Sequence, residues 1–133
     1  MNITVKMLIK NDYPEHLLDI FQSEWPENCE TTLENLLRAV ELGLDLNWFA
    51  QNFLSDSAFV DYIKNTASAF AKNLKATAPF LKRYILNAAC PSQEKYMKAI
   101  TPLTMEYMRD VAPILAQMMM DNGSIGEELE TIK

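Results

Sequence analysis

Apolar residues follow two different periods along the chain, and the change between them separates one short segment from a long helical remainder. Over residues 2–10, apolar residues occupy every second position from Ile3 to Ile9, and the turn pair Asn11-Asp12 follows. A period of two is typical of a strand. No second segment alternates comparably, so the sequence leaves open whether this strand is simply extended or pairs with another chain.

Beyond residue 12 the apolar positions recur every three or four residues, which is the helical period. Prolines, side-chain caps and a glycine mark where these helices begin and end. The predicted boundaries are Pro14 to Pro26 for the first helix, Thr31 or Thr32 to Gly43 for the second, and Asp45 for the start of a shorter third. In the second helix, Glu34 and Arg38 have the four-residue spacing of an ion pair on one face.

The strongest helical pattern begins at Ser55 or Ser57. Five of its apolar side chains fall within an arc of about 80° on a helical wheel, and this stripe is predicted to face the core. The stripe consists of Phe59, Ile63, Ala67, Phe70 and Leu74. Pro79 is predicted to end the helix, because an interior proline lacks the amide donor and clashes with the preceding turn.

Three further segments follow Pro79. They are a short segment over 80–89, a helix from Ser92 to about residue 100, and a last helix that begins at Thr101-Pro102 and ends at Asn122-Gly123. The acidic tail over 124–133 is predicted to fray. The sequence therefore predicts one all-α domain over 1–123, a bundle of five or six helices to which the N-terminal segment adds at most one short β-strand.

The last helix carries an apolar arc of about 200°, wider than one contact requires. Its first stripe consists of Leu103, Tyr107, Val111, Ile114 and Met118. The second, the predicted hydrophobic interface, consists of Met105, Met108, Ala112, Leu115 and Met119. Either the helix is central in the bundle, or the second stripe meets a homodimer partner or a hydrophobic ligand, a role that flexible methionine side chains suit.

Charge is sorted into blocks within the 133 residues, whose net charge is −6. Residues 1–56 hold ten acids and three bases, residues 57–120 hold four acids and eight bases, and the remainder holds four acids and one base. A net negative chain is a poor ligand for nucleic acid or for an anionic membrane surface. The helix–Gly43–helix outline over 35–52 suggests a helix-turn-helix, but its second helix has no Lys or Arg to meet phosphates.

Candidate chemistry is sparse, so we expect no enzyme activity, no metal and no cofactor. His16 is the one histidine, and a metal site needs at least three converging ligands. Cys29 and Cys90 lack C-x-x-C spacing and have no histidine nearby in sequence to serve as a base. Because the N-terminal residues also lack the apolar core of a signal peptide, we expect a cytoplasmic protein with reduced thiols.

The leading hypothesis is a non-enzymatic protein-binding module, a small acidic inhibitor or neutraliser of a basic partner such as an immunity protein, antitoxin or anti-defence protein. Acidic surfaces steer basic partners and repel nucleic acid. The predicted partner-binding residues are Asp12, Glu15, Asp19, Glu24, Glu27, Glu30, Glu34 and Glu41. The alternatives are a regulatory or ligand-binding bundle with a methionine-rich dimer seam or pocket, and a small helical enzyme.

Overall fold

A computed structural model of the chain describes the backbone of residues 1–86 and 93–132, and side chains within these ranges up to residue 121. The described elements are β1 (Asn2–Thr4), α1 (Val5–Lys10), α2 (Glu15–Glu24), β2 (Asn28–Glu30), α3 (Leu33–Glu41), α4 (Leu46–Phe53), α5 (Asp56–Leu86) and α6 (Gln93–Ile132). The fold is all-α, as predicted. Cys90 and the predicted helix cap at Ser92 lie outside the described residues.

The predicted N-terminal strand is only three residues long and pairs within the chain. β1 is antiparallel to β2, with Ile3 opposite Cys29 and both side chains buried. Thr4 then caps α1, since its hydroxyl oxygen accepts from the Met7 amide at 3.2 Å. The strand prediction is wrong beyond Thr4 because Leu8, which alternation places on the polar side, is fully buried in the helix.

The caps of α3 and α4 follow the sequence signals. Thr32, not Thr31, caps α3 by accepting from the Asn35 amide at 3.2 Å, whereas the buried Thr31 hydroxyl donates to the Met1 carbonyl. Gly43 follows α3 with a φ of +83°, a conformation that glycine adopts without strain. Asp45 caps α4 by accepting from the Asn47 amide at 2.9 Å.

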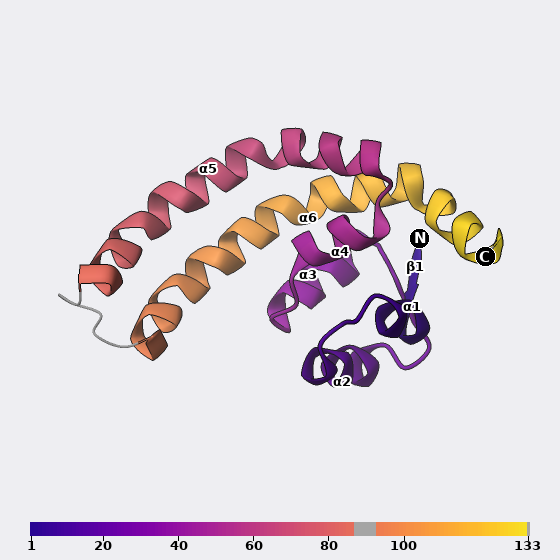
Figure 1. Cartoon of the computed structure of the whole chain (residues 1–133), viewed down its shortest axis with the longest axis horizontal. Coiled ribbons are helices and arrows are strands. Elements are labelled where there is room, and N and C mark those ends of the chain that lie inside the picture. Colours follow the sequence, from indigo (N-terminus) through magenta and orange to yellow (C-terminus); the bar gives the residue numbers. More distant parts are fainter. Residues whose placement is uncertain (87–92, 133) are drawn as a thin grey trace.

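Two long helices dominate the molecule. Figure 1 shows α5 and α6 as two bowed helices side by side, with α3 and α4 against the other side of α6 and with α1 and α2 farther away. The predicted breaks at Pro79 and at Thr101-Pro102 are wrong, because α5 and α6 continue through them and α6 also passes Pro113 and the Asn122-Gly123 pair. All three prolines are exposed, so the carbonyls that lose an amide partner can meet water.

Both apolar stripes of α6 are used inside one chain. α6 contacts α5 on one side and α3 and α4 on another, so the helix is central. The second stripe is therefore core: Met108, Ala112, Leu115 and Met119 are buried, and Met105 is half-buried. Most of this stripe therefore faces the chain's own core, which leaves the half-buried Met105 as its most accessible side chain.

The face of α5 that meets the core also differs from the prediction. Ala58, Tyr62 and Thr66 are its buried residues. In the predicted stripe, Phe59 is half-buried, while the other four side chains are exposed. Between α5 and α6, Asn73 donates to the Leu103 carbonyl at 3.3 Å. The rings of Phe70 and Tyr84 also pack against those of Tyr107 and Tyr96.

Candidate functional site

All eight predicted partner-binding acids are exposed. They come from the turn before α2, from α2 itself, from the segment that leads through β2 to α3, and from α3. Within the described residues, only Glu24 and Glu41 among them form ion pairs, and both pair with Arg38. The N-terminal block therefore presents most of its negative charge to solvent, which is the arrangement that steers a basic partner.

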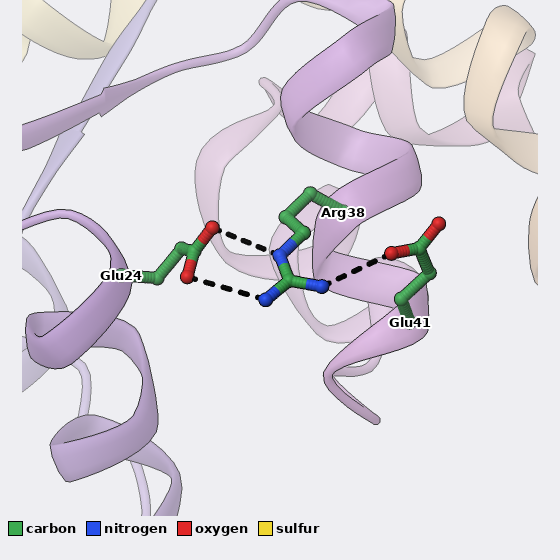
Figure 2. Close-up of polar contacts among 3 residues, drawn as sticks. All are labelled: Glu24, Arg38 and Glu41. Atoms are coloured by element: carbon green, nitrogen blue, oxygen red, sulfur yellow. Dashed lines mark hydrogen bonds and ion pairs between the residues drawn. The ribbon is translucent and has the colours of Figure 1, made fainter.

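Arg38 joins two of these acids across two helices (Figure 2). Its guanidinium donates to both Glu24 oxygens, at 2.8 and 3.5 Å, and to Glu41 at 3.1 Å. These hydrogen bonds, Glu24 first, raise the pKa of Arg38 further above its ordinary value. The predicted pair of Glu34 with Arg38 does not form, because the carboxylates of Glu24 and Glu41 take the guanidinium instead. The trio keeps a net charge of −1.

A groove of about 480 Å³ lies beside this trio, between the α3–α4 turn and the first half of α6. Three methionines of α6 contribute to its mainly apolar lining, and Glu41 and Asp45 are its two acidic lining residues, on the α3–α4 side. The groove is lined by Val40, Glu41, Leu42, Gly43, Leu44, Asp45, Met97, Ile100, Thr101, Thr104, Met105 and Met108. Because Glu41 also belongs to the Arg38 trio, the acidic surface and the groove are continuous.

The electrostatics of the groove favour a cation. Glu41 and Asp45 are both exposed acids, and they flank the C-terminus of α3, where the helix dipole places partial negative charge. Methionine side chains adapt to irregular apolar surfaces. The groove is therefore suited to an apolar group that carries a positive charge at one end.

A second polar cluster lies inside the fold and serves structure. The Tyr62 hydroxyl donates to the Asn47 side-chain oxygen, and the Asn47 amide nitrogen donates to the Tyr107 hydroxyl at 3.2 Å. Burial, followed by the proximity of Tyr107 and Asp45, raises the pKa of Tyr62. This cluster joins α4, α5 and α6, and its tyrosines are too buried to reach a substrate.

Of the sequence candidates for reaction chemistry, the structure describes His16 and Cys29, and no hydrogen bond joins these two. Burial, and then the charge of Glu30, raises the pKa of the Cys29 thiol to about 12, so it is a poor nucleophile at neutral pH. His16 is exposed on α2. The part of the chain that the structure describes contains no group of three or more His, Cys, Asp or Glu residues arranged to hold a metal.

No described helix has both the length and the apolar content to cross a membrane. In comparisons with known proteins, the chain matches no family model, no curated protein and no solved structure.

Sequence reasoning identified the acids but missed the groove. Its two walls are about 60 residues apart in the chain and meet only because α6 packs against α3. A partial signal was present, since the apolar arc of the last helix is too wide for one contact. This signal did not lead to the groove, because the expected break at Pro102 assigned Met97 and Ile100 to a different helix.

Proposed function

We propose that this protein is a non-enzymatic binding module that captures a basic, amphipathic segment of a partner protein. In this proposal it is a small acidic inhibitor or neutraliser, of the immunity, antitoxin or anti-defence kind. The observation that carries the proposal is the continuity between the exposed acidic surface and the apolar groove through Glu41. We also propose a cytoplasmic location, in which the buried Cys29 thiol stays reduced.

The acidic surface accounts for the first stage of binding. Ten acids against three bases in residues 1–56 attract a basic partner over roughly the Debye length, about 8 Å at physiological ionic strength. Such attraction raises the association rate more than the final affinity. Nucleic acid is repelled by the same charge.

The groove accounts for the second stage. Its volume of about 480 Å³ falls within the range of specific ligand sites, roughly 300–1,000 Å³. Apolar side chains on one face of a partner helix would fill it, in the manner of known helix-in-groove complexes. Lysine or arginine side chains on the flank of that helix would then lie beside Glu41 and Asp45.

A small amphipathic cation is the second candidate ligand, because the groove offers the same apolar lining and acidic rim to a free molecule. This version corresponds to a ligand-binding regulatory bundle. It differs from the first in one respect: a small ligand would not need the acids of α2, which lie outside the residues that line the groove.

The test uses two synthetic helical peptides, one built of leucine and lysine and its leucine–glutamate counterpart. We expect the protein to bind the first with an association rate that falls as salt rises, and not to bind the second. Asp19→Lys with Glu27→Lys should slow association, while Glu94→Lys with Asp121→Lys, which changes the net charge equally elsewhere, should not. Equal rates in both double variants across a salt series would refute the steering role.

The groove is tested separately. Met97 is 49% exposed, so Met97→Lys places a positive charge in the groove without disturbing the core. We expect roughly tenfold weaker binding of the leucine–lysine peptide, the equivalent of about 1.4 kcal/mol. Met120→Lys, at a 74% exposed methionine farther along the same helix, is the matched control and should bind normally. Equal affinities for the two variants would exclude the groove.

A further inference from the structure

The outer face of α5 carries a row of large apolar side chains, which we name the α5 stripe. Its members are 44–69% exposed, and on a helical wheel they fall within an arc of about 60°. They are Ile63, Phe70, Leu74, Leu81 and Ile85. The arc is centred about 110° round the helix from the buried face of Ala58, Tyr62 and Thr66. The stripe therefore lies outside the face of α5 that packs into the core.

No polar side chain interrupts this outer face. Between residues 59 and 86, an arc of about 100° contains the stripe and otherwise only Val60, Ala67, Ala71 and Ala78. From Ile63 to Ile85 the face is about 33 Å long. At its edge Phe70 contacts Tyr107 of α6, with 6.1 Å between the ring centroids, and it is still 49% exposed. An apolar face of this width is usually one that a partner covers.

An open hollow of about 350 Å³ lies at the C-terminal end of the stripe. Its lining combines four apolar side chains with one lysine. The lining residues are Ala78, Leu81, Lys82, Ile85 and Leu86. Such a hollow suits an acyl chain that is attached to a phosphate group.

Basic side chains follow one edge of the outer face. Lys64, Lys75 and Lys82 are exposed, and they lie within about 20° of one another on the wheel, directly beside the apolar arc. None of the three forms an ion pair within the residues that the structure describes, whereas Lys72 pairs with Glu106 of α6 at 3.2 Å. Residues 62–86 hold five bases and no acid. The outer side of α5 is therefore positively charged.

An apolar face bordered by lysines is the pattern of a helix that lies in the plane of an anionic membrane surface. The methylene stem of each lysine extends along the apolar surface, while its ammonium group reaches the lipid phosphates. Because the acyl layer is fluid, such a contact requires no shape complementarity. The apolar width and the lysine edge of α5 meet both requirements of this pattern.

The acids of the N-terminal block lie too far away to oppose this contact. Figure 1 shows α6 between α5 and the pair α3 and α4. Packed helices are about 8–10 Å apart, so the acids of α3 lie roughly two such spacings from α5, beyond the Debye length of about 8 Å. The two acids of α5, Asp56 and Asp61, both lie in its first two turns. The net charge of −6 is thus a sum over separate surfaces and does not describe α5.

We propose that the outer face of α5 docks the protein on an anionic lipid bilayer. The α5 stripe lies at the boundary of the acyl chains, and Lys64, Lys75 and Lys82 contact the phosphate headgroups. The proposal does not rest on the binding function argued above, because the groove and the acids of α2 lie on other elements.

The first test is flotation of the full chain with lipid vesicles. We expect the wild type to float with vesicles of phosphatidylglycerol, less so as salt rises, and not with vesicles of phosphatidylcholine. Leu74→Glu and Ile85→Glu should each weaken binding more than about tenfold, because each moves a carboxylate into the apolar boundary. These residues are 52% and 69% exposed, so circular dichroism should show an unchanged fold. Ile9→Glu, at a 59% exposed residue of α1, is the matched control and should float normally.

The lysine edge is tested separately. Lys75→Gln combined with Lys82→Gln should weaken binding to phosphatidylglycerol vesicles roughly 25-fold, since one lysine near an anionic surface contributes about fivefold. Lys6→Gln combined with Arg109→Gln removes the same charge from exposed residues of α1 and α6 and should bind within a few-fold of wild type. Equal weakening in the two double variants would overturn the assignment to α5.

Two other results would overturn the proposal. One is a wild type that does not float with phosphatidylglycerol vesicles at low salt, and the other is normal flotation of both Leu74→Glu and Ile85→Glu. If the wild type does not float, sedimentation equilibrium identifies what covers the stripe instead. A dimeric wild type and a monomeric Ile85→Glu variant would assign it to a second copy of the chain.

Discussion

The two buried tyrosines Tyr13 and Tyr62 predict opposite responses to the same change, removal of the hydroxyl. Tyr62 is 1% exposed and its hydroxyl donates to Asn47. Tyr13 is 7% exposed and packs against Trp48, but its hydroxyl has no hydrogen-bond partner among the described residues. Because both rings are buried, replacement by phenylalanine isolates the effect of the hydrogen bond.

The expected magnitudes follow from that difference. Tyr62→Phe loses one hydrogen bond and should lower the free energy of unfolding by about 1 kcal/mol. Tyr13→Phe removes a buried hydroxyl without a partner and should raise the free energy of unfolding by about 1–3 kcal/mol. The melting temperature should move in opposite directions, by roughly 4 °C for each kcal/mol in a chain of this length.

Urea denaturation followed by circular dichroism at pH 7 measures the free energy of unfolding of both variants. The comparison holds provided that m, the slope of that free energy against urea concentration, is the same as in the wild type. Adding Asn47→Ala to each variant tests the cause. The coupling energy should be about 1 kcal/mol with Tyr62→Phe, because the two residues share the bond, and near zero with Tyr13→Phe. Destabilisation by Tyr13→Phe equal to that by Tyr62→Phe would refute the reasoning.

Three further predictions concern stability and reactivity. Burial and then the charge of Asp45 raise the pKa of Tyr13 to about 12, whereas the unfolded chain ionises this phenol from about pH 10. The free energy of unfolding should therefore be unaffected by this group below pH 10 and should fall as pH rises from 10 through about 12, which alkaline unfolding monitored by circular dichroism would show. Cys29, in a Cys90→Ser variant, should react with a thiol reagent at pH 8 only at the rate of unfolding, and rapid labelling of the folded protein, measured by mass spectrometry, would contradict its raised pKa. Leu115→Ala should lower the free energy of unfolding by about 2–5 kcal/mol in urea titrations, because Leu115 is fully buried, and a loss below 1 kcal/mol would show that α6 is not central.

Local signals predicted the parts of the fold that local physics decides. Thr32, Gly43 and Asp45 act at the ends of helices through contacts within three residues, so their residue types identify their roles. The exposure of the eight acids was likewise predictable, because burying an unpaired carboxylate is strongly disfavoured.

Tertiary packing decides the strand pairing and the lengths of the long helices, and the sequence-based predictions of these features were wrong. The strand β2 has only three residues, Asn28–Glu30, and its exposed–buried–exposed pattern is too short to mark a strand before Ile3 pairs with Cys29. Pro79 and Pro102 predict breaks, but packing between α5 and α6 continues past both, and each proline faces solvent.

The exposed stripe of α5 shows the limit of amphipathic patterns. Such a pattern identifies a face that needs covering without identifying what covers it. The core-facing surface of α5 includes Thr66 and Asn73, whose side chains are small and donate hydrogen bonds to backbone carbonyls. A pattern based on hydrophobicity alone does not mark such residues as part of the core. Sequence reasoning therefore assigned the stripe to the core, and the groove was missed for the related reason that its two walls belong to distant segments.

The central position of α6 has a consequence for the order of events during synthesis. Helices α3 and α4 are complete at Phe53, but the side chains that cover them come from α6, as late as Met119. At 5–20 residues per second the ribosome needs roughly 3–13 s to make the intervening chain. During that interval the faces of α3 and α4 that pack against α6 have no covering helix, so we expect these two helices to complete their packing only after α6 is made. Folding is therefore expected to be largely post-translational, and ribosomes stalled before α6 should release chains that proteases remove.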